Sequence, residues 1–117
     1  MHGRMHIDMA VLQGLQDVMA EDYPGLLEAY LDDSEERLRA LREALRQCDA
    51  GALARTAHSF KGSCSNMGAV GLAQLCLELE QAGREASLDQ AATLLRKVEL
   101  EISVVRVLFR AERRRFA

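Results

Sequence analysis

The stretch from Leu53 to Met67, LARTAHSFKGSCSNM, decides how this chain folds, because its apolar residues recur at the spacing of an α-helix. These residues follow one another at intervals of four, three, four and three: Leu53, Ala57, Phe60, Cys64 and Met67. Residues at such intervals lie along one face of a helix, which we expect to be buried. His58 is one position off this face, so we expect its ring to point away from the core.

The helical neighbours of His58 give this side of the helix a chemical character. Arg55 and Lys61 lie one turn before and after His58, and Gly62 and Ser65 lie four and seven residues after it. A neutral imidazole is a nucleophile, a lysine neutralises phosphoryl charge, and a glycine leaves room for a bulky group. Because a glycine inside a helix costs about 1 kcal/mol relative to alanine, Gly62 needs a steric reason. One side of this helix therefore carries an imidazole, a cation one turn away and a residue without a side chain.

Helical patterns extend outward from this stretch over the rest of the chain. Asp49 reads as the N-cap of the central helix, and 66–68 as its end. The other predicted helices cover 8–20, 24–48, 69–84 and a segment that begins at Ser87, where Gln90 completes a capping box. In the first helix, one face is predicted to carry Val11, Leu12, Leu15, Val18 and Met19.

Short turns between four long apolar stripes predict the fold class. We expect an all-α protein in which four helices form an antiparallel up-down-up-down bundle, with the short first helix capping one end. At 117 residues, we expect the whole chain, 1–117, to form one domain.

Composition narrows the classes of function. The net charge of −3 gives no reason to expect nucleic-acid binding, and no apolar run approaches the roughly 20 residues that span a bilayer. The N-terminus has no apolar signal segment, and three cysteines without CxxC spacing are typical of free thiols. We therefore expect a cytoplasmic protein. The absence of a GxxxxGK[ST] loop indicates that it does not use ATP directly.

The stretch 57–84, AHSFKGSCSNMGAVGLAQLCLELEQAGR, resembles the signature of histidine-containing phosphotransfer (HPt) domains. That signature combines AH-x-x-KG-S/A with a Gly-Ala or Gly-Leu pair and L-x-x-x-C-x-x-L-E. The resemblance implies a phosphorelay carrier, which takes a phosphoryl group from an aspartate of a receiver domain and passes it to another receiver. It implies partners among the receiver domains of hybrid sensor histidine kinases and of response regulators. The carrier needs no cofactor of its own, since Mg²⁺ is expected on the partner receiver.

By position in the signature, His58 is the phospho-acceptor, Lys61 lies beside the phosphoryl oxygens, and Gly62 leaves space for the incoming receiver. Many family members carry a glutamine, which hydrogen-bonds the imidazole, where this chain has Glu80. Glu80 either orients the ring through a hydrogen bond or is a surface charge. Arg84 matches a basic position of some members and has the alternative of a helix-end charge. With Glu80 and Arg84, Ser65 is the third residue that we expect to support the phospho-acceptor.

A carrier also needs a docking surface around its histidine. We expect Arg55 to contribute to it, together with Ala73 and Leu77, which lie off the core stripe of the fourth predicted helix. Leu15 or Met19 of the first helix is a further candidate. We expect the protein to be a monomer.

Two other classes of function remain open for such a bundle. One is a bundle that docks a signalling partner without relaying phosphate. The other is a metalloprotein with its site in the bundle core. The Glu-x-x-His pairs of di-iron bundles are absent, and His58 with Cys64 and Cys76 has no recognised ligand spacing, so we expect no metal site.

Overall fold

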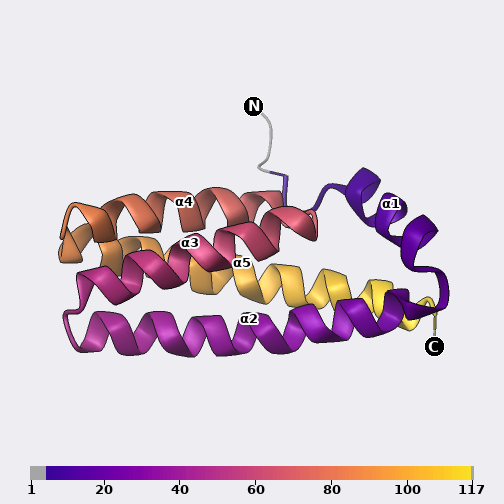
Figure 1. Ribbon diagram of the computed structural model, residues 1–117, viewed down its shortest axis with the longest axis horizontal. Helices are drawn as coiled ribbons and strands as arrows, with labels where there is room; N and C mark the ends of the chain where they lie inside the picture. The colour runs from indigo at the N-terminus through magenta and orange to yellow at the C-terminus, as the bar shows by residue number, and fades with distance from the viewer. Residues whose placement is uncertain (1–4, 117) are drawn as a thin grey trace.

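The computed structural model describes residues 5–116, which form five α-helices and one turn of 3₁₀ helix. Figure 1 shows four of the helices side by side and the fifth at one end. In chain order the elements are α1 (Met9–Met19), the 3₁₀ turn η1 (Ala20–Asp22), α2 (Tyr23–Arg46), α3 (Ala50–Asn66), α4 (Val70–Arg84) and α5 (Leu88–Arg114). None of the helices in this part of the chain is long and apolar enough to cross a membrane.

Helices α2 to α5 form an antiparallel four-helix bundle, as predicted. Each is joined to the next by a short turn, so neighbours run in opposite directions (Figure 1). Helix α3 packs against α2 and α4, and α5 packs against the same two helices from the other side. Helices α3 and α5 therefore lie at opposite corners of the bundle, and their outer faces point in different directions.

The turns follow from local chemistry. The Asp49 carboxylate accepts a hydrogen bond from the backbone N–H of Ala52 at 3.0 Å and so caps α3, as predicted. Gly68 ends the α3–α4 turn with φ at +76°, a conformation that glycine adopts without strain. Ser87 does precede α5, but its side chain makes no capping hydrogen bond, so the predicted capping box was wrong. Helix α5 therefore begins without a side-chain cap.

Helix α1 covers the end at which α2 and α5 extend beyond α3 and α4 (Figure 1). Leu12 is buried there, and Leu15 and Met19 are half-buried against the core. The prediction for Val18 was wrong, since Val18 is 82% exposed. It lies about 120° around the helix from Leu12, beyond the edge of the buried face, because α1 is covered on one side only.

The cysteines are all free thiols: Cys64 and Cys76 are buried in the core, and Cys48 is exposed. The Tyr30 hydroxyl lies 3.1 Å from Cys64 Sγ. These thiols fill core space between α2, α3 and α4.

Candidate functional site

Helices α3 and α4 come close together at Gly83, and this approach sets the geometry of the candidate site. A Cβ atom at Gly83 would lie 3.0 Å from the Ala50 carbonyl oxygen and 3.0 Å from Ala54 Cβ. Only a glycine allows this packing. The contact holds the last turn of α4 against the first turns of α3. Glu80 lies one turn before Gly83 and His58 one turn after Ala54, so these two side chains meet.

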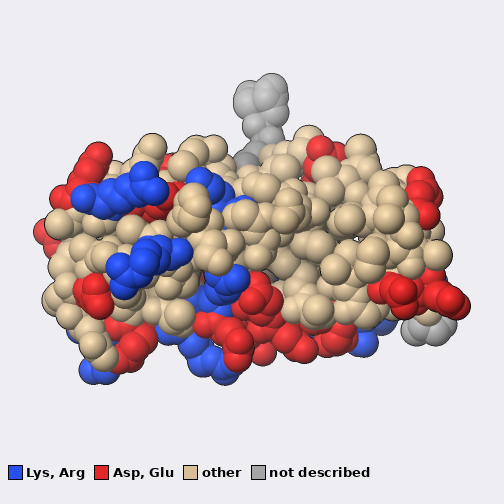
Figure 2. All heavy atoms as spheres, in the orientation of Figure 1, with Lys and Arg blue, Asp and Glu red and all other residues tan. Residues whose placement is uncertain are grey.

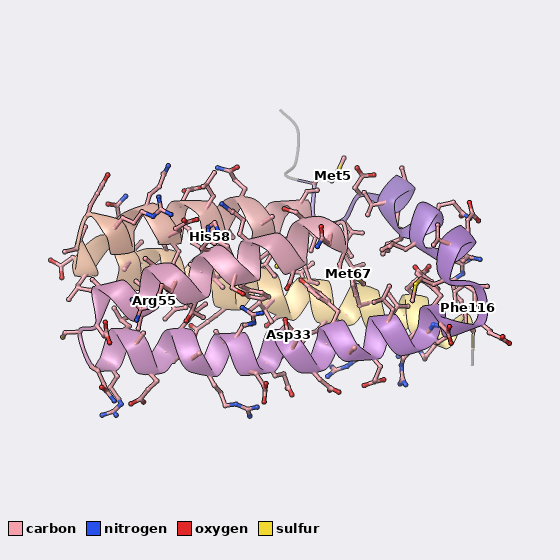
Figure 3. All side chains as sticks on the ribbon, viewed as in Figure 1. Met5, Asp33, Arg55, His58, Met67 and Phe116 are labelled. Atoms are coloured by element: carbon pink, nitrogen blue, oxygen red, sulfur yellow. The ribbon has the colours of Figure 1, made fainter. Side chains whose placement is uncertain are left out.

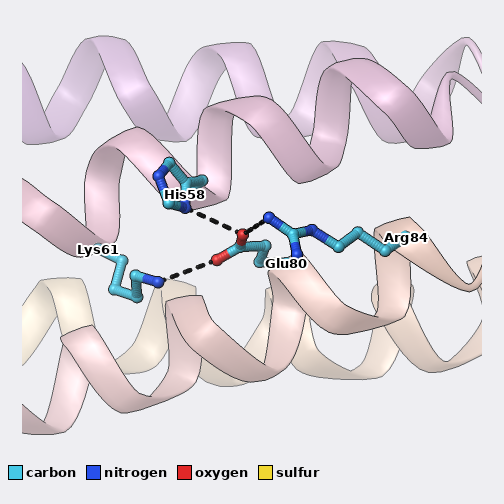
Figure 4. Close-up of polar contacts among 4 residues, drawn as sticks. All are labelled: His58, Lys61, Glu80 and Arg84. Atoms are coloured by element: carbon cyan, nitrogen blue, oxygen red, sulfur yellow. Dashed lines mark hydrogen bonds and ion pairs between the residues drawn. The ribbon is translucent and has the colours of Figure 1, made fainter.

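The His58 ring lies on the surface and is held from one side. Its side chain is 61% exposed, and Nδ1 lies 2.9 Å from Glu80 Oε2 (Figure 4). An ionised carboxylate only accepts hydrogen bonds, so Nδ1 is the nitrogen that carries the proton. In a neutral ring, Nε2 then keeps its lone pair. This nitrogen points away from Glu80 in Figure 4.

Glu80 is the centre of the site. Its side chain is 4% exposed, which excludes the interpretation as a surface charge. Besides the His58 ring, it accepts hydrogen bonds from Lys61 Nζ at 3.2 Å and from the Arg84 guanidinium (Figure 4). Burial raises the pKa of Glu80, but the hydrogen bonds from Lys61 and His58 and the charge of Arg84 outweigh it, so the pKa lies below its ordinary value. The carboxylate is therefore ionised at neutral pH.

The two other residues of the predicted HPt motif differ in their surroundings. Lys61 is held against Glu80 and is 29% exposed, so its charge lies on the same side of the bundle as the ring. Gly62 is exposed, and a Cβ atom there would meet nothing within 4 Å. No neighbour in the fold requires a glycine at this position.

A shallow hollow of about 200 Å³ opens beside the ring, lined by Ala54, Arg55, His58 and Arg84. Figure 3 shows Arg55 and His58 on the same helix, α3. Arg55 and Arg84 thus bring two more cations to the histidine. Ser65 is two turns beyond His58 on α3 and lies outside this hydrogen-bonded group.

The docking residues predicted on α4 follow the same edge of the helix as Glu80 and Arg84. Leu77 is half-buried, and Ala73 is half-buried and packs against the core. Figure 2 shows basic side chains gathered over α3 and α4 in the left half of the view, with acidic side chains below them along α2. The surface around His58 is thus positively charged, and the neighbouring surface along α2 is acidic.

The sequence did not predict one part of this site, the shared contact of His58, Lys61 and Arg84 with a single carboxylate. Nor did it predict the close approach of α3 and α4 at Gly83. The signal available for this close approach was the position of Gly83, three residues after Glu80 on the edge of α4 that faces inward. In residues 5–116, no three His, Cys, Asp or Glu side chains gather as metal ligands would.

In this site, a buried carboxylate holds an exposed imidazole between cations, on the outside of a four-helix bundle. This arrangement points to one class of protein. The family model described as Hpt domain matches residues 25–107, so the chain belongs to the Hpt family of histidine phosphotransfer domains. Its role is phosphotransfer in two-component signalling, and it belongs among phosphocarriers.

Among solved structures, the chain is similar to histidine-containing phosphotransfer protein B (HptB) of Pseudomonas aeruginosa PAO1, at 50% identity. This match covers 98% of the chain and 100% of the HptB chain, with a TM-score of 0.95. A rice protein described as a histidine-containing phosphotransfer protein shares the fold at 21% identity and a TM-score of 0.82, over 93% of this chain and 80% of the rice chain. No curated protein sequence matches the chain.

Proposed function

We propose that His58 is the residue that carries the phosphoryl group. The observation that supports it best is the 2.9 Å contact between Nδ1 and the buried Glu80 carboxylate, which leaves Nε2 as the nucleophile. Nε2 attacks the phosphorus of a receiver's aspartyl phosphate, the N–P bond forms, and the bond from phosphorus to the aspartate oxygen breaks. The aspartate is regenerated as a carboxylate. The same steps in reverse load the second receiver.

The cations around His58 balance the charge of the transferred group. Lys61 is the residue we expect closest to the phosphoryl oxygens, because its amine already lies beside the ring. Arg84 and Arg55 border the hollow next to His58, so either guanidinium has room to approach a bound phosphoryl group. Glu80 keeps the ring oriented while these cations act.

The rest of the transfer chemistry comes from the partner in this proposal. Phosphoryl transfer needs positioning and neutralised charge, and an acidic cluster with Mg²⁺ on the receiver supplies what the His58 face does not. The protein then works as a monomeric, single-domain carrier, 1–117, in the cytoplasm, where it meets receivers of hybrid sensor kinases and response regulators. Gly62 gives the receiver its close approach, since nothing fills the space above it.

One experiment tests the acceptor. The purified protein is mixed with a receiver domain carrying ³²P-phosphate, and the label on the protein is followed. We expect the wild type to become labelled with an acid-labile phosphoryl group and His58→Gln to remain unlabelled. His6→Gln is the matched control, because His6 Nδ1 also lies against a buried carboxylate, Glu101, at 2.7 Å. Labelling of His58→Gln would refute the assignment, and an unlabelled wild type would favour a docking module without relay activity.

A second experiment tests the docking surface on α4. Leu77 is half-buried on the edge that carries Glu80, so we expect Leu77→Asp to weaken receiver binding and slow transfer with little change in melting temperature. Leu100→Asp is the control, because Leu100 is 71% exposed on α5 at the other side of the bundle. A large fall in melting temperature would instead assign Leu77 to the core.

A further inference from the structure

Helix α5 carries a second apolar stripe, on its outer face, that the bundle does not cover. Its members follow at intervals of four, three and four residues: Leu100, Val104, Val107 and Ala111. Leu100 is 71% exposed and Val107 63% exposed. The intervals are those of a coiled-coil seam, which is the pattern that receives another helix.

Two shallow hollows border the stripe. One hollow, of about 360 Å³, is lined by Val104, Val107 and Leu108 together with Ser103. A larger hollow, of about 570 Å³, continues from Leu108 to Met9 at the start of α1. His6, Ile7 and Met9 line the side of this larger hollow that faces α5. The hydrogen bond between His6 and Glu101 fixes this segment to α5.

One edge of the stripe is basic. Arg96, Ser103 and Arg110 are seven residues apart and form a row along the helix, and Arg114 follows one turn after Arg110. None of these arginines, nor Lys97 near the start of the stripe, forms an ion pair with another residue of 5–116.

Three of the four carboxylates of α5 do not balance this charge, because they are engaged elsewhere, and the fourth, Asp89, lies in the first turn of the helix, before the stripe begins. Glu99 pairs with Arg42 of α2 at 2.6 Å. Glu101 is held by His6, and Glu112 by Tyr23 and Arg115. From Arg96 to Arg114, the outer face of α5 therefore presents an apolar seam beside arginines that no residue of 5–116 pairs.

We propose that this face binds an acidic amphipathic helix of a partner protein, whose apolar side covers the stripe and whose carboxylates meet Arg96, Arg110 and Arg114. A second copy of this chain fits worse, since an antiparallel pair through this seam places arginine rows against each other. A membrane surface also fits worse. The seam lacks the exposed Trp and Phe residues typical of interfacial helices.

Because α5 and α3 lie at opposite corners of the bundle, the partner helix leaves His58 free for receivers. The two surfaces would allow one carrier to be held by one protein while it exchanges phosphate with another. This inference is independent of the identity of the phosphorylated residue.

The test uses a fluorescent three-heptad helical peptide with Leu at the seam positions and Glu on both flanks, and a matched peptide with Lys in place of Glu. We expect the acidic peptide to bind the wild-type protein and the Lys peptide not to bind. The double variants Leu100→Asp/Val107→Asp and Arg96→Glu/Arg110→Glu should each weaken binding about tenfold or more. These residues are exposed, so unchanged melting curves are the check on folding.

NMR chemical shifts locate the peptide. We expect shifts on the outer face of α5 and in the N-terminal segment, none at His58 or Gly62, and unchanged receiver transfer with peptide bound. The proposal is overturned if the acidic peptide does not bind, if the Lys peptide binds equally, or if both double variants bind normally. It is also overturned if light scattering shows a dimer that Leu100→Asp/Val107→Asp dissociates, or if phosphatidylglycerol vesicles bind the wild type and not that variant.

Discussion

His58 and Lys61 share one hydrogen-bond acceptor, the Glu80 carboxylate, and this sharing prepares the site before a partner arrives. Lys61 lies 3.2 Å from Oε1, and the ring lies 2.9 Å from Oε2 of the same group. A charge fixed in place stabilises a developing phosphoryl charge better than one that must first be ordered. Because the two groups use different oxygens, the carboxylate holds both at once.

Removal of the Lys61 amine should slow transfer. Lys61→Ala loses one charge-assisted contact to the phosphoryl oxygens, so we expect the rate constant to fall by the equivalent of about 1.5–3 kcal/mol at most. Quenched-flow measurement with a phosphorylated receiver gives this rate. Lys97→Ala, an exposed lysine on α5, is the matched control. Equal rates for Lys61→Ala and Lys97→Ala would remove Lys61 from the chemistry.

The buried Glu80 carboxylate should also make stability depend on pH. Its pKa is lowered in the folded state, so it binds fewer protons there than in the unfolded chain. The stabilisation is therefore present above the ordinary glutamate pKa of about 4.3 and is lost as pH falls through the lowered value. We expect Glu80→Gln to be less stable than the wild type at neutral pH. Thermal unfolding from pH 7 to pH 3 should show this gap close, and a gap independent of pH would contradict the assignment.

At the scale of helices, the same substitution in α3 and α4 should have opposite effects. Gly62→Ala places its Cβ in open space, so we expect helix propensity to raise the free energy of unfolding by about 1 kcal/mol. Gly83→Ala places its Cβ 3.0 Å from Ala50 and Ala54, so we expect it to lower that free energy by about 1–3 kcal/mol. Chemical denaturation measures both.

These variants also separate stability from function. Gly62→Leu should keep the bundle folded and still slow transfer, because its side chain fills the space for the receiver. Gly25→Leu, at another open helical glycine, is the control for bulk alone. Normal transfer by Gly62→Leu would show that the receiver does not approach this face.

The sequence predicted the helices well because their signals are local. Asp49 caps α3 through a residue three positions away, and the positions of His58, Lys61 and Gly62 on one side of α3 follow from helical geometry alone. The contact of Glu80 with His58 spans 22 residues and depends on how closely two helices pack. Val18 was misplaced for a related reason, because only tertiary packing decides how much of the apolar face of α1 is covered.

At the scale of the whole molecule, the end of the bundle far from His58 is held by its own buried polar contact. The Tyr23 hydroxyl donates to Glu112 Oε2 at 2.8 Å and joins the start of α2 to the end of α5. Burial and the hydrogen bond to Glu112 raise the pKa of Tyr23, so the hydroxyl stays protonated and remains a donor. Phe116 packs edge-on against the same ring, with centroids 5.2 Å apart.

Loss of this contact should affect stability without affecting phosphotransfer. Tyr23→Phe leaves the buried Glu112 with one donor fewer, so we expect the free energy of unfolding to fall by about 1–3 kcal/mol. The transfer rate should stay at the wild-type value, because His58 lies in the other half of the bundle (Figures 1 and 3). Slower transfer by the folded variant would mean that the two ends of the molecule are coupled.

The hollow beside His58 is shallow, and the ring is 61% exposed, so nothing in residues 5–116 encloses it. A phosphoryl group on Nε2 would remain in contact with bulk water between one partner and the next. Its survival would then depend on the spontaneous hydrolysis of the N–P bond rather than on shelter by the protein. The rate of this hydrolysis would set the lifetime of the phosphorylated carrier. A phosphoryl group that reached no second receiver within that lifetime would be lost without a phosphatase.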